Sequence, residues 1–133
     1  MVVLDASALL ALTYREDGHE HVTEQLAAGA VISAVNWSEV SQKLAFQSGN
    51  AEQIGEMLLA TGLRIEPFGA DDARRAARLY PHTRAAGLSL GERSCLALAA
   101  RFGRVALTAD RAWKAIDGLV LDEELIQVDL IRG

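Results

Sequence analysis

VVLDASALLAL, residues 2–12, is the stretch that decides the fold. Its first three residues, Val2-Val3-Leu4, favour a short buried strand, and Asp5 follows them directly. The small and aliphatic residues from Ala6 to Leu12 then favour a helix. A short apolar strand that passes straight into a helix is typical of proteins in which helices cover a parallel sheet.

The rest of the chain repeats this alternation. Further strands are expected at Ala30–Ile32, Arg64–Pro67, Arg104–Thr108 and Ile126–Leu130. Helices are expected at Ala6–Leu12, His19–Ala28, Val35–Gln47, Ala51–Ala60, Ala70–Tyr80, Leu90–Phe102 and Asp110–Ile116. Since Pro67 cannot donate to a neighbouring strand, its strand is expected at a sheet edge. The pattern predicts an α/β fold, a three-layer α/β/α sandwich with a small parallel sheet of four or five strands. No linker divides the chain, so residues 1–133 are expected to form one domain.

Composition and charge narrow the function. The 133 residues carry a formal net charge of −5, which argues against purely electrostatic binding of nucleic acid. A nucleic-acid enzyme stays open, because metal ions can bridge an acidic pocket to a phosphate. The single cysteine, Cys95, cannot form an internal disulfide and is interpreted as a buried thiol in a reducing compartment. The apolar start has no basic leader and is too short to span a bilayer, so we expect a cytoplasmic protein without a membrane segment.

Four acidic residues fall where a parallel sheet would bring them together. Asp5 follows the first strand and Asp110 the fourth, while Glu39 and Glu92 lie near the starts of two helices. Ligands of such sheets bind beyond the carboxyl ends of the strands. Four carboxylates within a few ångströms would repel by roughly 4 kcal/mol per close pair at an effective dielectric near 20, so a cation is expected among them. Because no cysteine or histidine cluster accompanies the acids, Mg²⁺ or Mn²⁺ is the natural occupant.

Each acid also has a purely structural interpretation. Asp5 and Asp110 are suited to cap the helices that follow them. Ser89 and Glu92 match the capping box, in which a serine and a glutamate three residues on satisfy each other's backbone donors. Glu39 is badly placed for a cap, so an exposed helix face is its structural alternative. The residues alone leave both roles open for all four acids.

The order of these motifs resembles that of the PIN-domain ribonucleases, and more narrowly of the VapC-type toxins of bacterial toxin–antitoxin pairs. The blocks that carry the resemblance are VVLDASALLAL, NWSEV, LSLGERSCLALA and ALTADRAW, and together they span nearly the whole chain. The resemblance implies a PIN-like fold and an Mg²⁺- or Mn²⁺-dependent endoribonuclease that hydrolyses RNA phosphodiester bonds. It also implies a small VapB-like antitoxin that neutralises the enzyme, and a homodimer.

The resemblance assigns the family's site residues to individual positions of this sequence. Asp5, Glu39 and Asp110 match the family's metal-site acids, whereas Glu92 stands where the family usually has aspartate. The glutamate is one methylene longer, so metal binding there implies a shifted geometry or an intervening water. The small hydroxyl positions around the acids are occupied by Ser7 and Thr108.

The mechanism that we derive from these acids is a metal-activated water attacking phosphorus in line. Asp5 and Asp110 would hold the metal, and Glu39 and Glu92 would complete the site or orient the water. Arg111 and Lys114 are candidates to hold a neighbouring phosphate, with a solvated helix face as the alternative.

Other function classes fit less well. A non-catalytic binding module with this fold remains the alternative, and the glutamate at 92 makes it conceivable. A haloacid-dehalogenase-like enzyme would need a second aspartate at Ser7, and a receiver domain would need one where Pro67-Phe68-Gly69 stands.

Histidine and tryptophan patterns add no second site. His19 and His21 fall on different faces of a helix start and have no third ligand, so they do not predict a zinc site. Trp37 and Trp113 are suited to stack on bases, but packing in the core or at a subunit interface is favoured.

Overall fold

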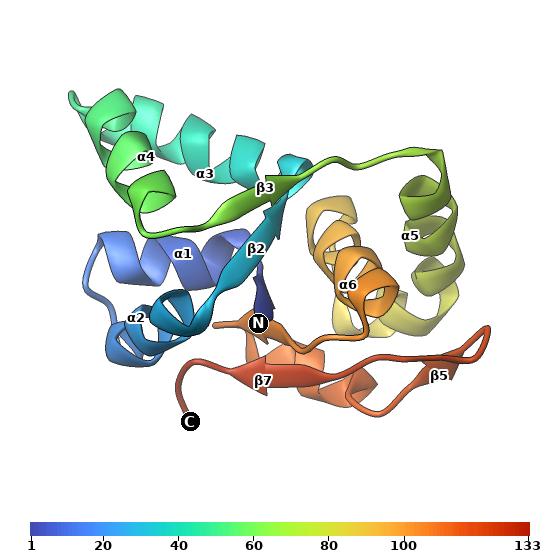
Figure 1. The fold of residues 1–133 in the computed structure, drawn as a ribbon. Helices are drawn as coiled ribbons and strands as arrows, with labels where there is room; N and C mark the ends of the chain where they lie inside the picture. Colours follow the sequence, from blue (N-terminus) through green and yellow to red (C-terminus); the bar gives the residue numbers. More distant parts are fainter.

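The structure, a computed structural model, describes all 133 residues, and its elements follow the expected alternation (Figure 1). The strands are β1 (Val2–Leu4), β2 (Ala30–Ser33), β3 (Arg64–Glu66), β4 (Ala106–Thr108), β5 (Val120–Leu121), β6 (Glu124–Leu125) and β7 (Val128–Leu130). The α-helices are α1 (Ala6–Thr13), α2 (His19–Ala28), α3 (Ala34–Gln47), α4 (Ala51–Ala60), α5 (Ala70–Thr83) and α6 (Leu90–Phe102), and the 3₁₀-helices are η1 (Arg84–Ala86) and η2 (Arg111–Ile116). None of the helices is both long enough and apolar enough to cross a membrane.

Five strands form one parallel sheet in the order β3-β2-β1-β4-β7. The strand β3 lies at an edge, as Pro67 after it predicted. The register aligns Leu4 of β1 with Ile32 of β2 and with Leu107 of β4. The three strands therefore end at the same edge of the sheet, where Asp5 comes beside Thr108.

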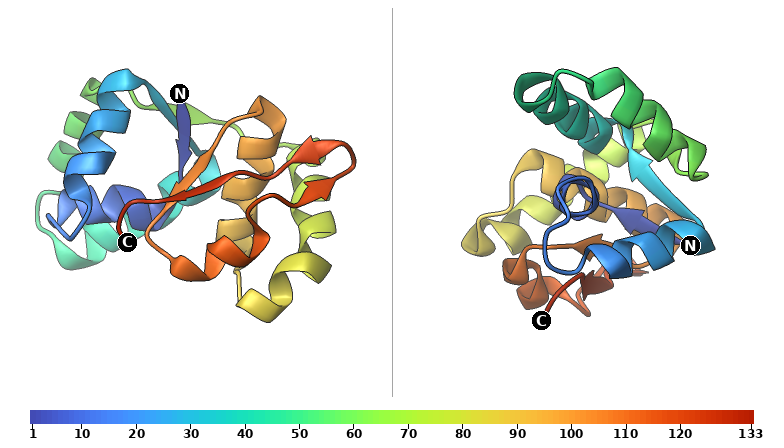
Figure 2. Two further views of the ribbon diagram at one scale, coloured as in Figure 1. Left: turned by 90° about the horizontal axis from the view of Figure 1, so that it is seen from below. Right: turned by 90° about the vertical axis from the view of Figure 1, so that its left-hand side faces the viewer.

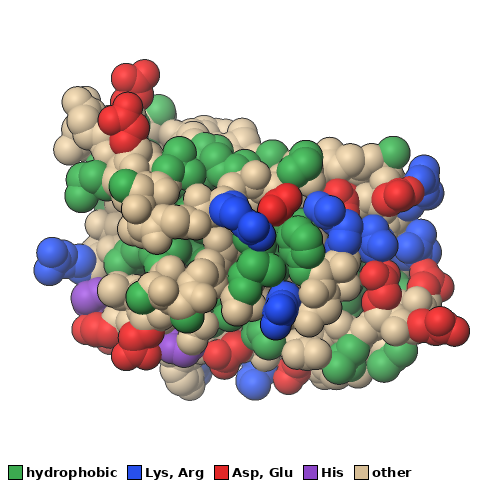
Figure 3. Space-filling model, in the orientation of Figure 1, with side chains coloured by type: hydrophobic (Ala, Val, Ile, Leu, Met, Phe, Trp, Pro, Cys, Tyr) green, Lys and Arg blue, Asp and Glu red, His purple; other side chains and the backbone are tan.

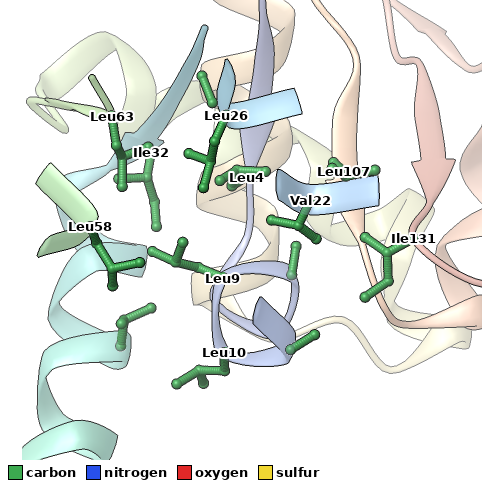
Figure 4. Close-up of a cluster of buried hydrophobic side chains, with 14 of the residues drawn as sticks. Leu4, Leu9, Leu10, Val22, Leu26, Ile32, Leu58, Leu63, Leu107 and Ile131 are labelled. Atoms are coloured by element: carbon green, nitrogen blue, oxygen red, sulfur yellow. The ribbon is translucent and has the colours of Figure 1, made fainter. Parts of the chain in front are cut away.

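The sheet is covered on both faces, which confirms the predicted three-layer sandwich (Figure 2). Side chains alternate along each strand. Leu4 and Leu107 pack with side chains of α1, α2, α3 and α4 in one apolar cluster (Figure 4). Val3 and Ala106 face the other way, into a second cluster with α5, α6 and η2. Each fully buried aliphatic side chain stabilises the fold by roughly 1.5–3 kcal/mol, so the two cores hold the strand ends in place.

Several element boundaries differ from expectation, most of them by a single residue. The helix α5 continues past Pro81 to Thr83, since a proline this near the helix end removes only one hydrogen bond. The strands β4 and β7 begin two residues later than predicted. The hairpin β5–β6 was not predicted at all. Its turn residues Asp122 and Glu123 both have positive φ, and no glycine marks the turn in the sequence.

Arginines of the C-terminal half gather with acidic side chains near α5 (Figure 3). The ion pairs include Arg74–Asp71, Arg75–Glu124, Arg78–Asp122 and Arg101–Asp72. Two of them join α5 to the β5–β6 hairpin. Because the positive charges are paired locally, this face is not a basic surface for nucleic acid.

Candidate functional site

The four predicted acids line one open cavity of about 230 Å³ at the carboxyl edge of the sheet. The residues that line it are Asp5, Ala6, Ser7, Asn36, Glu39, Lys43, Ser89, Glu92 and Asp110. Only one of the nine is hydrophobic, and four carboxylates face a single lysine. The cavity is therefore strongly acidic and built from the ends of separate elements.

Asp5 is the most buried of the acids, with 3% of its surface exposed. Its Oδ1 accepts the Ser7 hydroxyl at 2.7 Å and the Ala8 N–H at 2.9 Å, and its Oδ2 accepts the Thr108 hydroxyl at 2.8 Å. Burial raises the pKa of Asp5 from 3.8 to about 6, although these three hydrogen bonds oppose the rise, and the nearby charge of Glu92 adds to it. Asp5 thus caps α1 and still presents a carboxylate that is costly to ionise without a cation.

Ser7 and Thr108 connect the junction of β1 and α1 to the junction of β4 and η2. Their hydroxyl oxygens lie 3.3 Å apart. The Ser7 hydroxyl also accepts the Ala109 N–H at 3.0 Å, and the Thr108 hydroxyl accepts the Asp110 N–H at 3.1 Å. The pair fixes both the Asp5 side chain and the backbone that carries Asp110.

Asp110 caps the short helix η2. Its Oδ1 accepts the Ala112 N–H at 3.0 Å, and the residue is exposed. The capping interpretation is correct, but it uses only one of the two oxygens. The other oxygen makes no hydrogen bond within the chain and is free to serve a ligand.

Glu39 lies half-buried on α3, in contact with α6 rather than on a purely solvated face. Its Oε1 accepts Asn36 Nδ2 at 2.9 Å, and the same nitrogen donates to the Gly91 carbonyl oxygen at 2.8 Å. Both partners are acceptors, so the amide orientation of Asn36 is determined by chemistry. The Oδ1 of Asn36 is buried and has no partner. Sequence reasoning did not find Asn36.

Glu92 forms the predicted capping box with Ser89. Its Oε1 accepts the Ser89 N–H at 3.0 Å, and its own N–H donates to the Ser89 hydroxyl at 3.2 Å. Its Oε2 accepts the indole N–H of Trp113 at 2.7 Å. Different oxygens of the Glu92 carboxylate therefore take the two protein partners, one in the helix cap and one in the core.

Cys95 is fully buried beneath the cavity, as predicted, with its Sγ 4.0 Å from the Val3 carbonyl oxygen. Burial raises the pKa of the Cys95 thiol well above its usual value, and the charges of Asp5, Glu39 and Glu92 add to this rise. A neutral, enclosed thiol is a packing residue rather than a nucleophile.

The basic residue that lines the cavity is not one of the two that were predicted from the sequence. Arg111 and Lys114 are exposed on η2, and neither lines the cavity. Lys43 does line it. The signal for Lys43 was present in the sequence, since Asn36, Glu39 and Lys43 are spaced three and four apart and share one helix face.

The donors suit a hard divalent ion that keeps part of its water. No three acidic, histidine or cysteine side chains stand close enough together to hold a metal directly. Mg²⁺, however, is usually held through one or two carboxylates and several waters. The cavity offers carboxylate oxygens with free lone pairs, and the amide of Asn36 holds one oxygen of Glu39 at its wall. The residues present therefore fit Mg²⁺ or Mn²⁺ with intervening water.

Comparison with known proteins agrees with this fold. The family model of the PIN domain matches residues 2–119. The search of curated proteins gave no match.

Solved structures share the fold across nearly the whole chain. A toxin–antitoxin complex from Klebsiella pneumoniae is 23% identical with a TM-score of 0.69, and the match covers 90% of this chain and 92% of that one. The DNA-bound VapBC of Salmonella typhimurium is 15% identical with a TM-score of 0.71, over 98% and 99% of the two chains. VapC20 of Mycobacterium tuberculosis, a sarcin–ricin loop cleaving toxin, is 20% identical with a TM-score of 0.69, over 86% and 94%.

Proposed function

Because this chain belongs to the PIN domain family, we propose that it is an Mg²⁺- or Mn²⁺-dependent endoribonuclease that hydrolyses RNA phosphodiester bonds. The observation that supports this most strongly is the acidic cavity, where Asp5, Glu39, Glu92 and Asp110 meet from four separate parts of the chain. Such a concentration of carboxylates is unfavourable unless a cation belongs there.

Asp5 and Asp110 hold the ion in this proposal, and Glu39 and Glu92 complete its surroundings through water. The bound ion supplies positive charge that lowers the pKa of water and stabilises negative charge on a scissile phosphate. The chain contributes the fixed orientation of the acids. Ser7 and Thr108 keep both oxygens of Asp5 in place, and Asn36 holds Oε1 of Glu39.

Lys43 is the side chain that we assign to the RNA backbone near the cut. It is the one basic residue that lines the cavity, and its ammonium suits a phosphate next to the reacting one. Arg111 and Lys114 lie exposed on η2, next to Asp110 in sequence, where they are placed to contact RNA further along the strand. An enzyme of net charge −5 needs such local positive groups to hold RNA.

A VapB-like antitoxin and a homodimeric state belong to the same proposal. The antitoxin is supported by the fold neighbours, two of which are a toxin–antitoxin complex and a VapBC assembly, and the homodimer follows from the family resemblance alone. A third neighbour is itself a toxin that cleaves the sarcin–ricin loop. A toxic ribonuclease requires an inhibitor, so a small partner that covers the acidic cavity is the expected regulator.

The test is RNA cleavage by the purified chain. Single-stranded and structured RNAs are incubated with Mg²⁺, Mn²⁺ or EDTA, and the unaltered chain is compared with Asp5→Asn. Asp17→Asn, an exposed acid outside the cavity, is the matched control. We expect cleavage with either ion, none in EDTA, and none from Asp5→Asn. Cleavage that survives both EDTA and Asp5→Asn rules the proposal out.

A PIN-like binding module without cleavage activity is the second candidate. The observation that favours it is Glu92, whose two oxygens are both engaged by the chain itself. The same assay separates the two functions. A binding module would retain RNA in a filter or mobility assay and leave it uncut at every metal concentration.

A further inference from the structure

Trp113 is the largest fully buried side chain of the protein, with 0% of its surface exposed. Its ring belongs to the cluster formed by α6 and the neighbouring strands. A buried indole needs an acceptor for its N–H. Here the acceptor is a carboxylate of the acidic cavity, because Nε1 donates to Oε2 of Glu92 at 2.7 Å.

The same residue also contacts a second acid of the cavity. The backbone N–H of Trp113 donates to the Asp110 carbonyl oxygen at 3.2 Å, within the short helix that Asp110 caps. Trp113 is thus bonded to Asp110 through its backbone and to Glu92 through its side chain. No residue that lines the cavity is hydrogen-bonded to both of these acids.

The capping box alone does not fix the Glu92 carboxylate. Ser89 holds only Oε1, and the side chain has rotatable bonds that leave Oε2 free to turn. The indole N–H holds this second oxygen. The glutamate side chain is long enough for one carboxylate to accept from both donors.

We propose that Trp113 is a positioning residue that fixes the Glu92 carboxylate relative to Asp110 in the metal site. It touches neither substrate nor ion and acts through its hydrogen bond to Glu92. The inference rests on the metal-dependent function proposed above.

The experiment removes the N–H and keeps the ring. The chain has two tryptophans, so Trp37→Phe leaves Trp113 alone. In that background Trp113 is replaced during expression by 3-benzothienylalanine, whose bicyclic shape is the same but has sulfur in place of N–H. Mn²⁺ affinity is measured by calorimetry for the Trp37→Phe protein with each ring. Partners of metal-ligating groups change metal affinity by about 10–100-fold, and we expect a loss in this range.

Glu92→Ala shows whether the loss of Mn²⁺ affinity on ring exchange depends on the proposed hydrogen bond between Trp113 and Glu92. In the Trp37→Phe/Glu92→Ala protein, the same ring exchange is expected to leave Mn²⁺ affinity unchanged. The single indole N–H resonance of the Trp37→Phe protein, followed by NMR, is expected to move upfield in Glu92→Ala. A purely packing role for Trp113 would leave Mn²⁺ affinity the same with either ring, because the ring shape is kept, whereas the N–H resonance reports only that the hydrogen bond exists.

Two results overturn the inference. One is equal Mn²⁺ affinity with either ring, and the other is an equal loss with and without Glu92. Failure of the proposed function has a different pattern, in which the Trp37→Phe protein with its natural Trp113 neither binds Mn²⁺ nor cleaves RNA.

Discussion

The carboxylate of Glu39 lies directly against the backbone of Gly91. A β-carbon placed on Gly91 would stand 2.6 Å from each of the two carboxylate oxygens, closer than nonbonded atoms approach. Two helices, α3 and α6, therefore meet at a position where only glycine leaves room for an acid of the cavity. Asn36 bonds across the same contact, to Glu39 on one side and to the Gly91 carbonyl on the other.

Gly91→Ala should disable the site while leaving the fold intact. The added methyl group displaces the Glu39 carboxylate, so we expect Mn²⁺ affinity and RNA cleavage to fall by roughly tenfold or more. Alanine is favoured over glycine in a helix by about 1 kcal/mol, which offsets part of the crowding. The measurements are calorimetry with Mn²⁺ and urea unfolding of the same samples.

Gly55→Ala is the matched control for that substitution. A β-carbon at Gly55 would make an ordinary contact with Trp37 at 3.7 Å, so this variant should bind Mn²⁺ normally and gain about 0.5–1 kcal/mol of stability. Normal metal binding by Gly91→Ala would show that Glu39 does not serve the site from its present position.

Asp5→Asn should stabilise the metal-free protein at neutral pH. The pKa of Asp5 is raised in the folded state, so the Asp5 carboxyl group ionises at a higher pH in the folded chain than in the unfolded chain. Its contribution to stability is full below the unfolded pKa of 3.8 and is lost as pH rises to about 6. A rise of this size corresponds to about 3 kcal/mol, and asparagine avoids the loss. Urea unfolding in EDTA at pH 4 and pH 7 measures the difference in free energy of unfolding between Asp5→Asn and the unaltered chain. A variant that is less stable than the unaltered chain at pH 7 would contradict this assignment.

Metal affinity should depend on pH through the same group. A bound cation requires ionised Asp5, so protons compete with Mn²⁺ below a pH of about 6. We expect the apparent affinity to rise from pH 5 to pH 7 and then to level off. Calorimetry at several pH values gives the profile. A flat profile over this range would mean that Asp5 is not a ligand.

Lys43→Ala should weaken RNA binding and leave the chemical step nearly unchanged. The lysine is assigned to a substrate phosphate rather than to the reacting water, so KM should rise several-fold at constant kcat. Removal of one phosphate contact should also lower the salt dependence of log KM by about one. Lys114→Ala, on the exposed face of η2, is the control and should change KM less. An equal loss in both variants would place the RNA elsewhere.

Much of the fold followed from the sequence because strands and helices alternate with clear apolar patterns. Residues 2–4 and 30–32 are short runs of apolar residues. The turn into the next helix is marked by Asp5 and Ser33, which cap the helices that follow. The β5–β6 hairpin was missed for an equally physical reason. Asp122 and Glu123 adopt positive φ without glycine, and the arginines of α5 that pair with the hairpin lie far away in sequence.

The sequence predicted the acidic residues of the cavity, but not the residues that hold their side chains in position. Asp5 and Asp110 follow strands, so the topology alone brings them together. The roles of Asn36, Gly91 and Trp113 depend on contacts between helices that local patterns do not encode. The same limit explains why Arg111 and Lys114, rather than Lys43, were the candidates to bind a phosphate. The sequence shows that they are close to Asp110, but it does not show which face of α3 lines the cavity.

Titration of Mn²⁺ into an RNA cleavage reaction tests the central claim most directly. The unaltered chain, Asp110→Asn and the control Asp17→Asn are compared on one single-stranded RNA. We predict that cleavage by the unaltered chain and by Asp17→Asn rises from zero and saturates with Mn²⁺, and that Asp110→Asn is roughly 100-fold slower at every concentration. Equal cleavage by Asp110→Asn, or cleavage that needs no divalent ion, would contradict the account.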